Sequence, residues 1–215
     1  MGCIFCHNPE SWDLQSGEEL DGTTLMRRLE RCRPFLHQPG LTISGGEPLM
    51  QPGFTLEVIR KAKTSGWHVA LDTSGWGPAE VFQRISEACD LVIFSIKHPL
   101  TPEKLAPGAD HQNILTNLET LAGLKIKVWL RYVLLPGWNA EPDCLAKISV
   151  IAKGLPNLER LEVLPFNSLA VDKWRELGKD SPLWRERLPK VSEERIIQAE
   201  QQIGWHKSNC SSMGV

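Results

Sequence analysis

The stretch Leu41–Pro48 (LTISGGEP) decides the fold of this chain. Its first half alternates apolar and polar side chains, and two successive glycines then interrupt the run, so the stretch predicts a β-strand that ends in a turn. The apolar residues that come next have helical spacing; they are Phe54, Val58, Ile59 and Ala62. A strand, a glycine turn and a helix form one unit, and the chain repeats this unit.

The alternation of strand and helix continues to about residue 166. Strands are predicted at Trp67–Thr73 (WHVALDT), Asp90–Ile96 (DLVIFSI), Lys127–Leu135 (KVWLRYVLL) and Leu161–Pro165 (LEVLP), and helices at about 78–88, 114–121 and 143–153. Strands that alternate with helices are typical of an α/β fold with a parallel sheet, closed or partly closed as a barrel.

The tail after residue 166 has a less regular pattern. Its prolines predict a loop over 178–191, and a helix over 193–203 and a short last strand follow. No low-complexity segment or linker divides the chain, so we expect one domain over residues 1–215. Within it we distinguish a loop at 1–12, a core at 41–166 and the tail at 167–215.

The composition excludes several classes of function. The 215 residues are 41% hydrophobic, which is enough for a sizeable core, and the net charge of -2 argues against a nucleic-acid surface. No stretch approaches the ~20 apolar residues of a membrane span. The six cysteines do not form a secreted disulfide framework. We therefore expect a cytoplasmic protein.

The first residues, Met1–Asn8 (MGCIFCHN), carry a second local signal. Cys3 and Cys6 lie three residues apart, with Phe5 before the second cysteine and His7 after it. In an intracellular chain, such a pair is typical of a metal or cluster loop. A zinc knuckle that uses both cysteines and His7 stays open as an alternative, although it would need further nearby ligands.

The ends of the predicted strands carry polar or glycine-rich residues. These ends are Gly45-Gly46-Glu47, Asp72-Thr73-Ser74, Ser95-Ile96-Lys97, Arg131 and Phe166-Asn167. In parallel α/β folds the ligand site lies at the C-terminal ends of the strands, so we expect these residues to share a pocket. On local evidence alone, the Gly-Gly-Glu turn could be a simple strand exit and Lys97 a solvated strand end.

Arg131 lies in a strand that is otherwise too apolar to face water. A buried guanidinium needs an anion beside it, because burying it alone is very costly. Either an internal Asp or Glu or the carboxylate of a ligand could supply that anion. We favour the ligand.

Several segments occur in an order and spacing that resemble the radical SAM enzymes, and most closely the pyruvate formate-lyase-activating enzymes. The segments are Cys3–Trp12 (CIFCHNPESW), Ser44–Glu47 (SGGE), Leu71–Gly75 (LDTSG), Lys127–Trp138 (KVWLRYVLLPGW), Glu162–Phe166 (EVLPF), Lys173-Trp174 and Leu177–Pro182 (LGKDSP). The resemblance covers nearly the whole chain. It implies a partial (β/α) barrel that activates a glycyl-radical enzyme by taking a hydrogen atom from one backbone glycine of that partner.

The resemblance also implies cofactors and partners. Cys3 and Cys6 would be ligands of a [4Fe–4S] cluster, and S-adenosylmethionine would chelate the open iron and be cleaved reductively to methionine and a 5′-deoxyadenosyl radical. The electron would come from a low-potential donor such as flavodoxin or ferredoxin. The partner would be a glycyl-radical enzyme such as pyruvate formate-lyase, and we expect a monomer that binds neither nucleic acid nor membrane.

The family pattern assigns contacts with S-adenosylmethionine to individual residues. Phe5 would pack near the adenine, Glu47 would bind the ammonium beside Gly45 and Gly46, and Arg131 would meet the carboxylate. Asp72 and Thr73 would hold the ribose or help to form a small cation site. The remaining cofactor-binding residues implied by the resemblance are His7, Ser74, Ser95, Lys97 and Asn167.

The sequence departs from the family pattern in two ways. The family loop is Cys-x3-Cys-x2-Cys, and Cys3 and Cys6 match its second and third cysteines. We therefore expect an N-terminal truncation or a misassigned start that removes the first cysteine and the first strand, and a chain that is poorly active and less stable than a complete barrel. In addition, Ser95 replaces an acidic residue, which would weaken the cation site, and Phe166-Asn167 replaces Tyr-His.

Two other functions remain open at this point. One is another radical SAM modifier of a small molecule or peptide, such as a deazaguanine-forming enzyme. The other is a barrel remnant that binds a partner without a cluster.

Overall fold

Five parallel strands form one sheet in the computed structural model, which describes residues 1–13, 15–185, 188 and 190–204. The strands pair in the order in which they occur along the chain. They are β1 Gly40–Ile43, β2 His68–Thr73, β3 Leu91–Ile96, β4 Lys127–Leu134 and β5 Leu158–Pro165.

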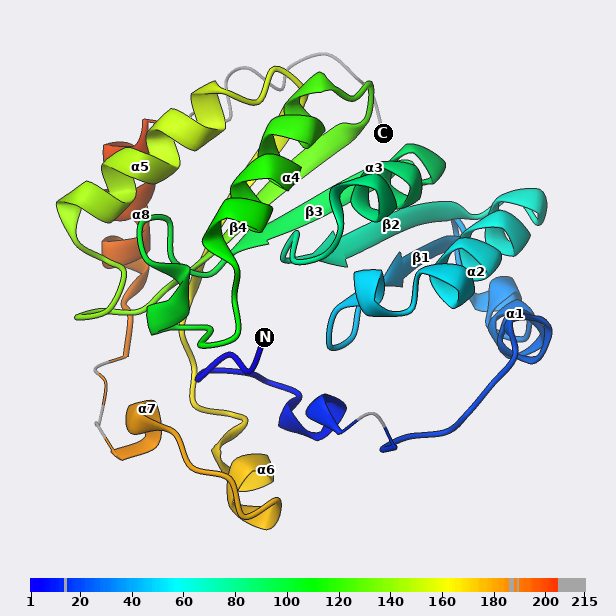
Figure 1. Ribbon diagram of the computed structural model, residues 1–215, viewed down its shortest axis with the longest axis horizontal. Helices are drawn as coiled ribbons and strands as arrows, with labels where there is room; N and C mark the ends of the chain where they lie inside the picture. Colours follow the sequence, from blue (N-terminus) through cyan, green and yellow to red (C-terminus); the bar gives the residue numbers. More distant parts are fainter. Residues whose placement is uncertain (14, 186–187, 189, 205–215) are drawn as a thin grey trace.

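Helices connect the strands and cover one face of the sheet (Figure 1). The connecting helices are α2 Pro52–Thr64, α3 Ala79–Ala88, α4 His111–Gly123 and α5 Pro142–Lys153. Because crossovers between parallel strands are right-handed and each new strand is added beside the last, successive helices fall on the same side. The other face is thereby left for a binding site.

The ends of the chain lie outside this repeating core. The helix α1 Gly22–Glu30 precedes the sheet, and α6 Val171–Glu176, α7 Pro182–Arg185 and α8 Glu193–Ile203 follow it. Short 3-10 turns occur at η1 Pro9–Trp12, η2 Arg33–Phe35, η3 Pro48–Met50 and η4 Pro102–Lys104. In Figure 1 the N-terminal segment, in blue, lies close to the arrowheads of β2 and β3.

Polar side chains and prolines define where several helices begin. Asp21 accepts a hydrogen bond from the backbone N–H of Thr24 at the start of α1, and Asp110 accepts one from Asn113 at the start of α4. The helices α2 and α5 have a proline in their first turn, where no helical hydrogen-bond donor is needed. No helix in the described ranges is both long enough and apolar enough to span a membrane.

The two faces of the sheet differ in chemistry. The face toward the helices carries the main core, which includes Val69, Leu71, Phe94, Leu130 and Tyr132, all with an exposed fraction of 0%. The other face has a smaller apolar cluster of Ala70, Leu91 and Ile93, with Trp129 against it. Because side chains alternate along a strand, the polar residues on this second face follow the small cluster toward the strand ends.

The structure confirms the predicted α/β fold and its parallel strands. β5 begins at Leu158 rather than at Leu161, and the loop predicted over 178–191 contains the short helix α7. The helix over 193–203 is confirmed as α8. The short last strand predicted at the end of the tail lies outside the described residues.

A buried amide joins the ends of β3 and β4. Asn139 has an exposed fraction of 0%, and its side chain donates to the carbonyl oxygens of Lys97 and Val133 at 3.0 and 2.9 Å. Its side-chain oxygen accepts from the backbone N–H of Leu135 at 2.7 Å. The side chain thereby fixes the backbone of Lys97 relative to the turn that follows β4.

We predict that Asn139→Leu destabilises the protein by about 3 kcal/mol, because three backbone groups then lose their buried partner. Urea unfolding followed by circular dichroism measures this change. Gln201→Leu on the exposed side of α8 is the matched control, with an expected effect within about 0.5 kcal/mol. Equal effects of the two substitutions would contradict the role given to Asn139.

Candidate functional site

The two cysteines of the N-terminal loop lie in a tight turn that is attached to the barrel. The backbone N–H of Cys6 donates to the carbonyl oxygen of Cys3 at 3.0 Å. Between them, the N–H of Ile4 donates to the carbonyl oxygen of Leu105 at 2.9 Å, in the loop after β3. Both cysteines are free and half-buried.

Three predicted site residues meet beside this turn. Burial raises the pKa of the Cys3 thiol, and the nearby ammonium of Lys97 partly opposes that rise. The same ammonium lies 5.9 Å from the centroid of the Phe5 ring. Phe5 is buried against Leu105 and Leu135. The end of β3 and the cysteine loop therefore form one continuous surface.

Glu47 connects the Gly-Gly-Glu bend to the end of β2. Its carboxylate accepts hydrogen bonds from the Thr73 hydroxyl at 2.6 Å, from the Ser74 backbone N–H at 2.9 Å and from the Ser74 hydroxyl at 2.5 Å. An ionised carboxylate has about four acceptor positions. Three of these positions are filled, and the fourth receives only a long contact from the Leu49 N–H at 3.4 Å, which an ammonium group could replace.

The bend also touches the N-terminal segment. A Cβ atom on Gly46 would lie 3.3 Å from the carbonyl oxygen of Ser11, so the two backbones approach closely here. At Gly45, with φ of 144°, a Cβ would meet nothing within 4 Å. The Ser74 hydroxyl, which contacts Glu47, also lies 3.5 Å from the sulfur of Met1. The cysteine loop and the Gly-Gly-Glu bend are therefore neighbours.

Arg131 takes part in an ion network on the open face of the sheet. Its Nη1 lies 2.7 Å from Oδ2 of Asp72, and its Nε lies 3.0 Å from Oε2 of Glu162. Glu162 is its register partner on β5, so both side chains lie on the same face. Ser95 donates to Asp72 at 3.3 Å, and Arg160 contacts Glu162 at 3.0 Å.

Arg131 therefore has internal anions as partners, the alternative that the sequence analysis left open. Our preference for the carboxylate of a ligand as its counter-ion is corrected to this extent. A contact with the carboxylate of a ligand stays a prediction. Glu162 is a site residue that our sequence reasoning missed. The available signal was one acidic residue in the otherwise apolar run LEVLP.

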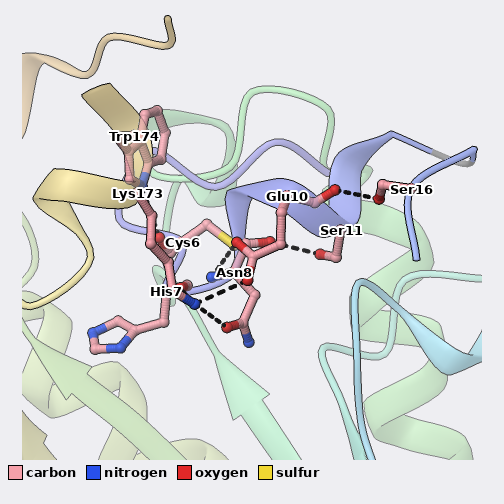
Figure 2. A network of polar contacts seen from close by, with 8 residues as sticks. All are labelled: Cys6, His7, Asn8, Glu10, Ser11, Ser16, Lys173 and Trp174. Atoms are coloured by element: carbon pink, nitrogen blue, oxygen red, sulfur yellow. Dashed lines mark hydrogen bonds and ion pairs between the residues drawn. The ribbon is translucent and has the colours of Figure 1, made fainter. Parts of the chain in front are cut away.

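Two predicted residues lie away from these contacts. The ring of His7 is exposed and points away from Cys6 (Figure 2). Asn167 is exposed just beyond β5, where its side-chain oxygen accepts from the backbone N–H of Leu169 at 3.2 Å. Neither residue belongs to the contacts of Glu47 or Arg131 described above.

The donor types fit the cofactors that the resemblance implies. Cys3 and Cys6 supply two soft sulfur ligands of the kind that iron–sulfur clusters require. Glu47 supplies an acceptor for an ammonium beside an open backbone bend. Within the described ranges, no group of three or more His, Cys, Asp and Glu side chains is arranged to hold a metal ion. The described donor set therefore consists of two thiols.

Comparison with known proteins gives the same picture over most of the chain. Residues 1–145 match the family model described as the radical SAM superfamily. The pyruvate formate-lyase-activating enzyme of Clostridium pasteurianum is 33% identical over 186 residues, covering 85% of this chain and 78% of the relative. The pyruvate formate-lyase 1-activating enzyme of Escherichia coli K12 is 32% identical over 214 residues, covering 96% of this chain and 86% of the relative.

Solved structures support the fold. A domain of the pyruvate-formate lyase-activating enzyme from Bacteroides vulgatus has a TM-score of 0.62 at 22% identity, covering 77% of this chain and 93% of that one. A radical SAM methyltransferase from Sphaerobacter thermophilus has a TM-score of 0.68 at 17% identity, covering 94% of this chain and 59% of that one. The sheet is thus a partial barrel of the radical SAM type.

The family model and the relatives together settle the cofactors, because radical SAM enzymes use a [4Fe–4S] cluster and S-adenosylmethionine. The long matches to curated relatives narrow the assignment further. The chain belongs to the radical SAM superfamily and, within it, to the family of pyruvate formate-lyase-activating enzymes.

Proposed function

We propose that this chain is an activating enzyme that takes a hydrogen atom from a backbone glycine of a glycyl-radical enzyme such as pyruvate formate-lyase. One observation carries the proposal: the cysteine loop, the Gly-Gly-Glu bend and Lys97 meet at the C-terminal edge of the sheet. When bound, the cluster and S-adenosylmethionine supply an electron and a 5′-deoxyadenosyl radical, which is the chemistry this reaction needs.

The protein groups bind and orient the reactants. Cys3 and Cys6 hold iron as thiolates. Glu47 binds the ammonium of the S-adenosylmethionine with the acceptor capacity that Thr73 and Ser74 leave free, and the bare backbone at Gly45 admits the ligand. Because these groups are already held by hydrogen bonds, binding requires little reordering of the site.

Lys97 and Phe5 act together at the neighbouring corner. The ammonium lies over the ring at 5.9 Å from its centroid, so a ligand that touches the ammonium lies near the ring. The fixed positive charge of Lys97 favours the deprotonated state of Cys3, and iron binding requires that state. Their roles in contacting S-adenosylmethionine are part of this proposal, as are those of His7 and Asn167.

The ion network around Arg131 lies on the open face of the sheet, and we propose that it forms the base of the ligand site, called its floor below. Arg131 and Arg160 carry two positive charges, and Asp72 and Glu162 carry two negative charges, so the four groups are balanced. A balanced network attracts a small cation weakly, in line with the loss of an acidic group at Ser95. We assign to Asp72 and Ser95 the orientation of the ligand's ribose.

The proposal also includes the domain organisation, the oligomeric state, the compartment and the electron donor. We propose a single domain and a monomer in the cytoplasm, with flavodoxin or ferredoxin as the electron donor. A barrel that binds a partner without a cluster is the second candidate, and iron uptake by the purified chain distinguishes it from the first. The long matches to activating enzymes argue against a different radical SAM modifier.

We predict that the chain binds iron and sulfide on anaerobic reconstitution and then cleaves S-adenosylmethionine when reduced. Iron and sulfide determination, electron paramagnetic resonance and chromatography of 5′-deoxyadenosine measure this. Cys3→Ser and Cys6→Ser should abolish iron binding, whereas Cys32→Ser, at an exposed thiol outside the site, should not. A wild-type chain that takes up no iron would favour the partner-binding barrel.

We predict that Glu47→Gln weakens binding of S-adenosylmethionine by about 10- to 100-fold, because a charge-assisted hydrogen bond to the ammonium is lost while the side-chain shape is kept. Calorimetric titration of the reconstituted protein measures the affinity. Glu57→Gln, at an exposed carboxylate paired with Lys61, is the matched control and should leave it unchanged. An unaltered affinity in Glu47→Gln would refute the assigned role.

A further inference from the structure

The tail of the chain returns to the cysteine loop through a lysine on α6. The ammonium of Lys173 lies 3.2 Å from the carbonyl oxygen of His7, 3.2 Å from the side-chain oxygen of Asn8 and 2.9 Å from Oε1 of Glu10 (Figure 2). These acceptors follow directly after Cys6. One charged group therefore binds three successive parts of a segment that is about 165 residues distant in sequence.

The next residue of α6 reaches the cysteine itself. The indole N–H of Trp174 donates to the carbonyl oxygen of Cys6 at 2.8 Å. The Trp174 ring has an exposed fraction of 2% and meets the Trp12 ring edge-on at 5.0 Å between centroids. On another side it contacts Trp184 at 5.7 Å. The donor is therefore held by packing, and its direction toward Cys6 is fixed.

A third contact binds the loop between the two cysteines. The hydroxyl of Ser181 donates to the carbonyl oxygen of Ile4 at 2.6 Å, and Ser181 has an exposed fraction of 1%. Leu183, two residues later, packs in the cluster that contains Phe5. The tail thus supplies side-chain donors for the carbonyl groups of Ile4, Cys6 and His7.

These donors matter because the loop has little structure of its own. From Met1 to Asn8 it contains no helix or strand, and while the Cys3 carbonyl accepts from the N–H of Cys6, the carbonyls of Ile4, Cys6 and His7 depend on partners elsewhere. Within the loop, the N–H of Asn8 lies 3.4 Å from the sulfur of Cys6. Lys173 fixes the side chain of the same asparagine. Contacts from the tail therefore set the direction of an amide that points at a sulfur ligand.

We propose that Lys173 and Trp174 are positioning residues of the iron site. They hold the backbone from Cys6 to Asn8 in its ligand-binding shape before iron arrives, and they slow the loss of iron afterwards. The part of this inference that concerns iron rests on the proposed function. The part that concerns the shape of the loop does not depend on it.

The first experiment uses the full chain without a cluster. Trp174→Phe keeps an aromatic ring against Trp12 and removes the N–H donor. Alkylation of each cysteine by iodoacetamide, followed by mass spectrometry, should become about fivefold faster at Cys6, the effect of losing one ordinary hydrogen bond. Buried Cys144 reports global unfolding and should react at the wild-type rate.

A matched control lies next to the varied residues. Arg175 follows Trp174 on α6 and pairs with the exposed side chain of Asp172, so Arg175→Gln should leave the reactivity of Cys6 unchanged. An unchanged rate at Cys6 in Trp174→Phe would overturn the proposal. Equal acceleration at Cys6 and Cys144 would also overturn it, because the tryptophan would then stabilise the fold as a whole.

The second experiment uses the reconstituted protein and follows the transfer of iron to a chelator. Trp174→Phe and Lys173→Met should each release iron about fivefold faster, and Lys173→Arg should restore a rate close to wild type because it keeps the positive charge. Wild-type release rates in both Trp174→Phe and Lys173→Met would overturn the role in retaining iron. If the wild-type chain binds no iron, the proposed function fails, and alkylation still decides the inference on the loop.

Discussion

The site depends on the carboxylate of Glu47, which joins two strand ends that local structure leaves independent. β1 has only four residues, and the bend after it contains two glycines, so its backbone has many alternatives in isolation. Three hydrogen bonds from Thr73 and Ser74 remove those alternatives by fixing the bend to the end of β2. The same serine meets the sulfur of Met1, and Gly46 meets Ser11. A single side chain thus fixes the bend that the N-terminal segment packs against.

The charges of the site fall into two groups. The ion network around Arg131 is neutral as a whole, and the ammonium of Lys97 is a separate positive charge. Arg131 lies between Asp72 and Glu162, and Arg160 balances the second carboxylate, so the floor has no excess charge. Ion pairs of this kind stabilise little by themselves, but removing one partner would leave a costly partly buried charge. Lys97 stands apart from this network, with its ammonium near Phe5 and Cys3. The site can therefore bind anionic groups at that corner while the floor keeps its shape.

Local patterns in the sequence predict much of this fold, and they fail where a residue's role depends on a distant partner. The strands at Trp67–Thr73 and Asp90–Ile96 follow from short apolar runs bounded by breakers, and the structure places both within a residue at each end. The partner of Arg131 was not predictable in the same way, because Glu162 reaches it only through the register of β4 and β5. In the tail the helix over 193–203 was predicted, but the two short helices before it were not. α6 and α7 are too short to show a periodic pattern, and they are stabilised by contacts with a loop at the other end of the chain.

The dependence of the loop on the tail follows from the lack of regular structure in the loop. Met1 to Asn8 form neither a helix nor a strand, and although the Cys3 carbonyl is bound by the N–H of Cys6, the carbonyls of Ile4, Cys6 and His7 have no helical or sheet partner. These carbonyls must then be bound by donors from elsewhere. A buried indole and a buried hydroxyl are suited to this, since Trp174 and Ser181 lose little further freedom when the loop is in place. The exposed ion pair of Lys173 and Glu10 orients the segment after Cys6 but contributes little to the free energy of folding. The barrel thus supplies the surface for the ligand, and the tail supplies the order that the cysteine loop lacks.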